Sequence, residues 1–233
     1  MYKAKVKTPV CPVRRGFQDS SEMITQFVYG EIVTVIEEKD QWRKCISDFD
    51  KYEGWADEKL IVKVENEVET EGVLTQNALQ HVDLPEGKRW LPAGSFANVP
   101  QTRMYREPFQ NAELFIGAPY LWGGKTVFGI DCSGLVQIAF LMSGKRLKRD
   151  AYQQAELGHT VAFVEEAQNN DLAFFDNDEG RINHVGIVRK DDDGLRIIHA
   201  SGEVRIDKFD HQGIFKESTG KYTHKLRILK RID

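Results

Sequence analysis

Residues 129–144 read GIDCSGLVQIAFLMSG, and this stretch decides the fold of the second half of the chain. From Cys132 to Ser143 the side chains are apolar nearly all round, which predicts a helix that is buried rather than lying on a surface. Asp131 stands at the N-cap position, and Gly144 ends the helix. A cysteine at the start of a buried helix is therefore the centre of the pattern.

Short apolar runs follow this helix and read as strands of one antiparallel sheet: Leu172–Phe175, Val185–Val188, Leu195–Ile198 and Leu226–Leu229. Upstream, Pro108 suits the first position of a helix whose apolar face holds Ala112, Phe115 and Ile116 and which stops at Gly117. A buried helix followed by an antiparallel sheet predicts an α+β domain over residues 107–233.

The first sixty residues instead predict an all-β module. Residues 32–36 are β-branched or apolar throughout, and residues 42–47 alternate at period two. Turn signals space such runs by roughly ten residues, as in a small barrel or sandwich. We therefore expect a small β-barrel over residues 1–65.

Residues 65–72 hold four Glu in eight positions, and their mutual repulsion favours an exposed connection. Beyond them, turn signals at 84–87 and 91–94 separate short segments. We expect residues 66–106 to form a linker or a degenerate second β module.

The composition excludes several classes of protein. The 233 residues are 41% hydrophobic and 29% charged, unlike collagenous, low-complexity or disordered chains. A net charge of -4 provides no basic surface for nucleic acid, and no run approaches the roughly 20 apolar residues that span a bilayer. The N-terminus lacks the apolar segment of a secretory signal. We expect a cytoplasmic monomer, or a periplasmic or cell-surface protein if a leader has been removed.

Three cysteines, Cys11, Cys45 and Cys132, are an odd count without a CxxC pair, which argues against a disulfide framework and a zinc site. Cys11 and Cys45 suit packing positions. Cys132 differs because free N–H groups and the helix dipole at a helix start stabilise a thiolate. We expect no metal or other cofactor.

Two histidines can complete a thiol site with Cys132. His184 begins one predicted strand and His199 ends the next, so a hairpin brings their imidazoles together. A helix docked on that hairpin would align a nucleophile, a base and a third residue that fixes the tautomer of the base. Spacing alone also allows ordinary core positions for all three. Polar or turn-like neighbours predict a surface position for the other histidines: His81, His159, His211 and His224.

Four motifs follow one another along the second half: YLWGG at 120–124, GIDCSGL at 129–135, NHVGIV at 183–188 and IHA at 198–200. Together they resemble the NlpC-type cysteine peptidases, papain-like enzymes that act on bacterial cell-wall peptides. Residues 22–26, Gly30-Glu31, Trp42 and Gly54-Trp-Ala56 resemble the bacterial Src-homology-3-like barrels that often precede this peptidase. The pairing is similar to the γ-D-glutamyl-L-diamino acid endopeptidases that recycle murein peptides.

This resemblance implies that Cys132 is the nucleophile, His184 the general base and His199 the orienting residue. It implies a papain-like domain and places Tyr120 near the oxyanion, where a donor must face developing negative charge. The substrate contacts it implies are Tyr120, Trp122, Asp131, Ser133 and Asp150, with Glu22 and Tyr52 of the barrel as candidates for a free substrate amine.

Two positions depart from the family pattern. Ala151 stands where the family commonly has Ser, which removes one hydroxyl contact to a substrate carboxylate. Asn169-Asn170 replaces Pro-Gly, and Asn tolerates a left-handed backbone better than most residues.

The expected function is hydrolysis of the bond between γ-D-Glu and a diamino acid in murein peptides with a free N-terminal L-Ala. A papain-like amidase or acyltransferase, and a wall-binding protein with a vestigial site, are the alternatives.

Overall fold

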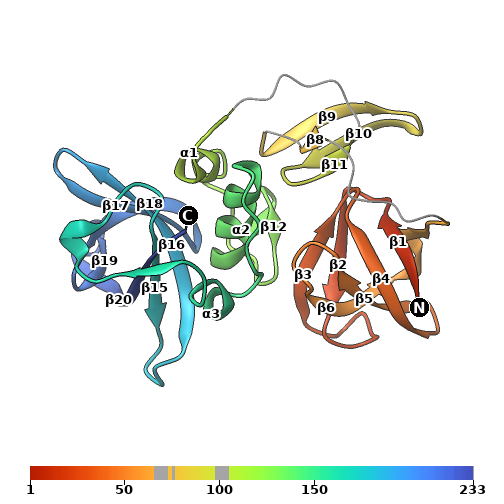
Figure 1. Cartoon of the computed structure of the whole chain (residues 1–233), viewed down its shortest axis with the longest axis horizontal. Helices are drawn as coiled ribbons and strands as arrows, with labels where there is room; N and C mark the ends of the chain where they lie inside the picture. Colours follow the sequence, from red (N-terminus) through yellow and green to blue (C-terminus); the bar gives the residue numbers. More distant parts are fainter. Residues whose placement is uncertain (66–72, 75–76, 98–104, 233) are drawn as a thin grey trace. The chain divides into compact units, whose positions relative to one another are not determined.

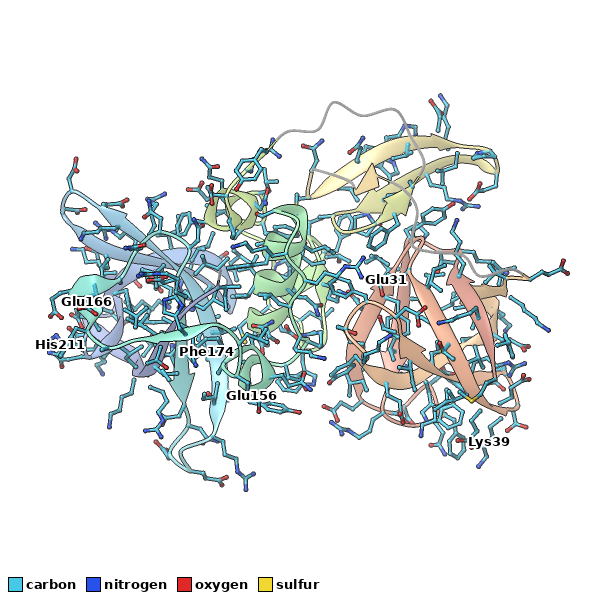
Figure 2. The ribbon with its side chains drawn as sticks, in the orientation of Figure 1. Glu31, Lys39, Glu156, Glu166, Phe174 and His211 are labelled. Carbon is cyan, nitrogen blue, oxygen red and sulfur yellow. The ribbon has the colours of Figure 1, made fainter. Side chains whose placement is uncertain are left out.

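The computed structural model describes residues 1–65, 73–74, 77–97 and 105–232 (Figure 1), and Figure 2 adds the side chains. The chain divides into two compact units. Unit 1 comprises Met1–Tyr105 and Leu121–Gly129, and unit 2 comprises Arg106–Tyr120 and Ile130–Asp233. Each unit has a hydrophobic core of its own.

Unit 1 is built on a seven-stranded antiparallel sheet with the order β3-β2-β6-β5-β4-β1-β7. Its strands and one 3-10 turn are β1 (Tyr2–Val6), β2 (Val10–Arg14), β3 (Met23–Val28), β4 (Ile32–Lys39), β5 (Trp42–Ser47), β6 (Glu53–Asp57), η1 (Glu58–Leu60) and β7 (Ile61–Lys63). Alternate side chains such as Val33 and Val35 enter a core that also contains Cys11 and Cys45. The prediction that these two cysteines are packing residues is confirmed.

A second pair of small sheets follows in unit 1. Its strands are β8 (Val73–Leu74), β9 (Leu79–Leu84), β10 (Gly87–Pro92) and β11 (Phe96–Ala97), with β9 paired to β10 and β8 to β11. The predicted turn at 84–87 therefore connects a β-hairpin. Gly30 has a φ of +83°, and a Cβ there would lie 2.0 Å from the Phe96 carbonyl oxygen, so this contact requires glycine. Part of the segment 66–106 lies outside the described residues.

Unit 2 contains a closed antiparallel barrel, drawn in cyan to blue in Figure 1. Its strands are β14 (His159–Val161), β15 (Leu172–Asp176), β16 (Ile182–Asp191), β17 (Gly194–Ser201), β18 (Glu203–Asp210), β19 (Gly213–Lys216) and β20 (Lys221–Arg231). The barrel closes because β20 pairs with both β15 and β19. Sequence analysis identified β15, β16, β17 and β20 but not β14, β18 and β19.

The helices of unit 2 are α1 (Pro108–Glu113), α2 (Cys132–Met142) and α3 (Ala151–Gln154), with a 3-10 turn η2 (Val164–Glu166). Helix α2 is buried from Cys132 to Leu141 and packs on β16, β17 and α1. The predicted α+β arrangement, a buried helix on an antiparallel sheet, is confirmed. Ile116 was wrongly placed on the apolar face of this helix, because α1 ends at Glu113 and Ile116 is 55% exposed. No helix within the described residues is long and apolar enough to cross a membrane.

The turn before β15 tolerates the departure from Pro-Gly. Asn170 adopts a φ of +72°, a left-handed conformation that Asn accepts more readily than most residues. Its side-chain oxygen also accepts a hydrogen bond from the Phe109 N–H at 2.8 Å. This turn thereby connects β15 to α1.

The two strands β12 (Lys125–Thr126) and β13 (Gly129–Ile130) form a short hairpin before α2. Lys125 is buried, and its N–H donates to the Gln26 side chain at 2.8 Å. The hairpin therefore fastens the segment 121–129 to the sheet of unit 1.

Candidate active site

A buried ion pair fixes the start of α2, the helix that presents Cys132. Asp131 caps the helix by accepting the Gly134 N–H at 2.7 Å. Arg149, which is 1% exposed, donates to both carboxylate oxygens of Asp131 at 3.0 and 2.6 Å and to the Ser133 hydroxyl at 2.9 Å. These contacts hold Asp131 and Ser133, which were predicted to bind substrate, within the framework around Cys132.

The thiol of Cys132 lies against the first residues of β16. Its Sγ is 3.9 Å from the carbonyl oxygen of Asn183, the residue before His184. Burial raises the pKa of the thiol to about 12, and the Asp131 charge adds to this effect. Hydrogen bonds from the Val185 and Ser133 N–H groups lower the pKa but do not outweigh burial. The expected thiolate is therefore absent from the resting site, and the thiol needs a base.

The imidazoles of His184 and His199 lie in contact, as the predicted hairpin implied. His184 Nε2 and His199 Nδ1 are 2.8 Å apart, and both rings are buried. The described contacts of Cys132 and His184 include no hydrogen bond between Sγ and the ring. Catalytic hydrogen bonds are often long before substrate binds.

Asp207 extends this pair into a relay that sequence analysis missed. Its Oδ2 lies 3.0 Å from His199 Nε2 and accepts the Arg205 Nε–H at 2.8 Å. Burial raises the pKa of Asp207, but the His199 and Arg205 hydrogen bonds prevail and hold that pKa below its usual value. Asp207 is therefore a carboxylate, which only accepts hydrogen bonds.

The hydrogen-bond partners of His199 and His184 determine which ring nitrogen carries the proton. Because the Asp207 carboxylate accepts, His199 carries its proton on Nε2 and leaves Nδ1 as an acceptor. His184 then carries its proton on Nε2, which donates to His199. The lone pair of the neutral His184 ring is left on Nδ1, the nitrogen available to take a proton from a thiol.

His224 was wrongly predicted to be a surface residue. It is half-buried on β20, and its ring stacks on His184 with centroids 4.1 Å apart and an interplanar angle of 22°. Burial lowers the pKa of all three histidines, that of His224 to about 4 and that of His184 well below its usual value. The cluster is therefore neutral at physiological pH. The remaining histidines, His81, His159 and His211, are exposed as expected.

The structure distributes the other predicted substrate contacts over both units. Tyr120, 36% exposed in unit 2, has a pKa raised chiefly by burial and further by the Asp131 charge, so its hydroxyl remains a donor. In unit 1, Trp122 Nε1 donates to Glu22 Oε1 at 2.8 Å. Asp150 forms a capping box with Gln153 at the start of α3. Tyr52 is half-buried beside β6.

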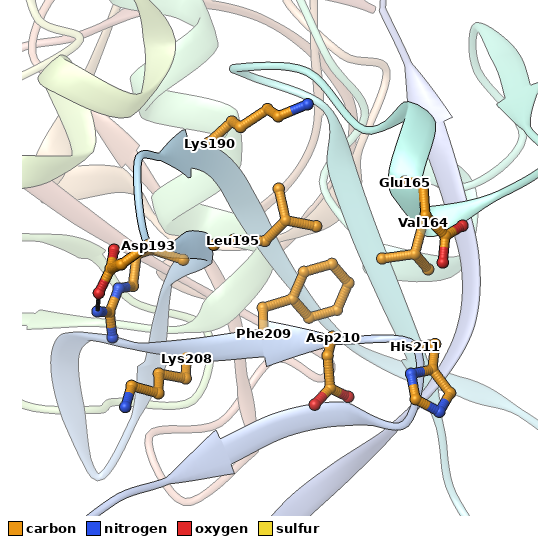
Figure 3. Close-up of a pocket in the computed structure, with 11 residues that line it drawn as sticks. Val164, Glu165, Lys190, Asp193, Leu195, Lys208, Phe209, Asp210 and His211 are labelled. Atoms are coloured by element: carbon orange, nitrogen blue, oxygen red, sulfur yellow. Dashed lines mark hydrogen bonds and ion pairs between the residues drawn. The ribbon is translucent and has the colours of Figure 1, made fainter.

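Two of the cavities among the described residues lie in unit 2. One of about 830 Å³ is lined by His224 and Asn183, together with Asp176, Asp178 and Tyr222. The other, of about 530 Å³, lies between η2, the β16–β17 turn and β18 (Figure 3), where Leu195 and Phe209 are surrounded by charged side chains. Only the first is lined by residues of the histidine cluster or next to it.

Comparison with known proteins agrees with this geometry. Residues 117–223 match the NlpC/P60 family, and residues 13–60 match the bacterial dipeptidyl-peptidase Sh3 domain. The chain is 28% identical over 213 residues to the γ-D-glutamyl-L-lysine dipeptidyl-peptidase of Bacillus subtilis, covering 75% of this chain and 72% of the relative. It is 26% identical to the Bacillus cereus protein of the same name, covering 87% and 75%.

A solved structure shares the whole fold. The crystal structure of an NlpC/P60 family protein from Bacillus cereus aligns with a TM-score of 0.76 at 22% identity, over 98% of this chain and 99% of the other. Family peptidases use a cysteine nucleophile, in agreement with a thiol at the start of α2. Residues 117–223 therefore form an NlpC/P60 domain of the cell-wall peptidase type, with a bacterial Sh3 domain in front of it at residues 13–60.

Proposed function

We propose that this protein hydrolyses the amide bond between γ-D-glutamate and a diamino acid in murein peptides with a free N-terminal L-Ala, in cytoplasmic recycling of cell-wall peptides. The observation that carries the proposal is the relay Asp207–His199–His184 beside the helix start that presents Cys132. The two relatives named γ-D-glutamyl-L-lysine dipeptidyl-peptidase support the substrate class.

The proposed reaction follows from the tautomers. His184 Nδ1 takes the proton of Cys132 as Sγ attacks the γ-carbonyl carbon, and the imidazolium is stabilised through His199 by Asp207. The tetrahedral oxyanion requires a donor, and the Tyr120 hydroxyl is proposed for this role. His184 returns its proton to the leaving amine, which gives a thioester and a free diamino acid. It then activates water to hydrolyse the thioester.

A synthetic tripeptide, L-Ala-γ-D-Glu-L-Lys, tests the reaction. We expect release of L-Lys and of the dipeptide, and no release by the Cys132→Ala variant. Transfer of the dipeptide to an added amine without net hydrolysis would instead identify an acyltransferase. Unchanged turnover by Cys132→Ala would exclude this nucleophile.

The N-acetylated tripeptide tests recognition of the free amine. We expect a higher KM for the acetylated peptide, and a higher KM for the free peptide in Glu22→Gln and Tyr52→Phe. Glu37→Gln, an exposed change on β4 of the same unit, is the matched control. Equal rates on both peptides would contradict an amine-binding site.

Cell fractionation of the host tests the proposed cytoplasmic location of the protein.

Asp207→Asn tests the relay without removing a reacting group. An amide can donate toward His199 Nε2 and so stabilise the wrong tautomers of both rings. Replacing the corresponding carboxylate of a Ser-His-Asp triad costs about 10⁴-fold in kcat, and we expect a loss of about 10²- to 10⁴-fold with little change in KM. Asp210→Asn on the same strand is the control. A wild-type kcat and pH profile in Asp207→Asn would show that the carboxylate does not position the base.

A further inference from the structure

Three histidines from three strands converge in unit 2 in a way that the proposed reaction does not require. His184 on β16, His199 on β17 and His224 on β20 each offer one ring nitrogen, and these three atoms lie within 4.8 Å of one another. The peptidase chemistry uses only His184 and His199. His224 supplies a third nitrogen.

The partners of each ring identify the atoms that face one another. His199 Nε2 is engaged by Asp207, which leaves Nδ1. His224 Nδ1 lies 2.9 Å from the Thr223 hydroxyl, which leaves Nε2. His184 contributes Nε2, the atom 2.8 Å from His199 Nδ1.

This cluster can become a three-histidine metal site once the stacked His184 and His224 rings turn toward the ion. Metal-binding imidazoles almost always donate their second N–H to a carboxylate, carbonyl or hydroxyl-type acceptor, as His199 does to Asp207. Zinc–nitrogen bonds of about 2.0–2.1 Å in a tetrahedron place ligand nitrogens roughly 3.4 Å apart. The separation of His184 from His199 must open by about 0.6 Å to reach that value.

A cavity reaches this cluster at His224. The 830 Å³ cavity is lined by His224, and Asp176 and Asp178 line the same cavity. Two carboxylates favour entry of a cation. The three rings then leave one tetrahedral position for water.

We propose that His184, His199 and His224 bind a divalent transition metal ion of the zinc class, and that its binding switches off the peptidase. The binding stands on geometry alone, whereas the inhibition rests on the proposed function. A metal on His184 Nε2 takes the lone pair at that atom, so the single proton of the neutral ring moves to Nδ1. No proton is gained or lost, but His184 can no longer accept the proton of the Cys132 thiol.

Co²⁺ and Zn²⁺ titration of the chelator-treated, full-length protein tests the site. We expect a 1:1 complex by calorimetry and a Co²⁺ absorption spectrum of tetrahedral nitrogen and oxygen ligation. His224→Gln should weaken Zn²⁺ binding by 10-fold or more. His159→Gln, an exposed change, and Cys132→Ala should bind as the wild type does. A thiolate-to-Co²⁺ charge-transfer band, or loss of binding in Cys132→Ala alone, would overturn the proposal by locating the ion on the thiol.

Activity with and without Zn²⁺ tests the switch. Saturating Zn²⁺ should slow tripeptide hydrolysis by the wild type more than 10-fold, and chelator should restore it. In His224→Gln, the rates of tripeptide hydrolysis with and without Zn²⁺ should be nearly equal at the Zn²⁺ concentration that inhibits the wild type. Full activity of the Zn²⁺-loaded wild type would overturn the inhibition. An inactive metal-free protein that still binds Zn²⁺ through His224 would refute the proposed function and leave the metal site standing.

Discussion

Each unit of this protein buries one cation beside one carboxylate, and the two pairs differ in how completely they are satisfied. In unit 2, Arg149 contacts both oxygens of Asp131, one of which also caps α2. In unit 1, Lys125 reaches one oxygen of Glu31 at 3.2 Å (Glu31 is labelled in Figure 2), and Glu31 Oε2 has no hydrogen-bond partner among the described residues.

The difference shows that two ion pairs that are equally buried need not stabilise their units equally. All four side chains are less than one-tenth exposed. A buried pair stabilises a fold only when geometry and further hydrogen bonds offset its desolvation. The Arg149–Asp131 pair meets that condition at the helix start that carries Cys132, whereas the Lys125–Glu31 pair meets it only in part because Glu31 Oε2 has no hydrogen-bond partner among the described residues.

Arg149→Met breaks the better pair and has the largest expected effect. It leaves Asp131 buried without its partner, so unit 2 should lose about 3–5 kcal/mol in its free energy of unfolding. Tripeptide turnover should fall with it because Asp131 also holds the first turn of α2. Urea unfolding of both proteins measures the loss. Arg149→Lys keeps the charge but not the two-point contact, so its free energy of unfolding should lie between those of the wild type and Arg149→Met. If Arg149→Met is as stable as the wild type, the Arg149–Asp131 pair does not stabilise unit 2.

The two ion pairs also show which features of the structure can be predicted from the sequence and which cannot. The continuous apolar pattern after Cys132 determines a buried helix locally, and motif order locates the two relay histidines. Arg149 stands 18 residues from Asp131, and nothing local to either residue reveals their contact.

His224 and Asp207 could have been found by extending strand periodicity. His224 lies two positions before Leu226, and on a strand that reaches back to Lys221 the two share the face that contacts Phe175. Asp207 lies opposite Ile197, two residues from His199, so both side chains point to one face once β18 is recognised. The sequence prediction lacked the full extent of β20 and the existence of β18, not the identity of the residues that the strands carry.

Lys125→Met breaks the weaker pair and should cost less than the change at Arg149. We expect unit 1 to lose about 1–3 kcal/mol, the cost of leaving a buried polar group unsatisfied. Glu31 limits this loss because burial already raises its pKa, so the carboxyl can take up a proton. Unfolding in urea checks the value, and the double variant Lys125→Met with Glu31→Gln should recover part of it. A double variant less stable than Lys125→Met would show that the charge on Glu31 stabilises unit 1.

Glu31→Gln has the smallest expected effect, and its sign depends on pH. Burial, aided by the Asp50 charge, raises the pKa of Glu31 above its ordinary value of 4.5 in spite of Lys125. The folded protein therefore binds this proton more tightly than the unfolded chain, which favours folding below about pH 4.5 and is lost as the pH rises through the folded pKa. The stability of the wild type relative to Glu31→Gln should accordingly decrease from pH 4 to pH 8 in urea titrations. A relative stability that instead increases over this range would mean that the Lys125 charge outweighs burial at Glu31.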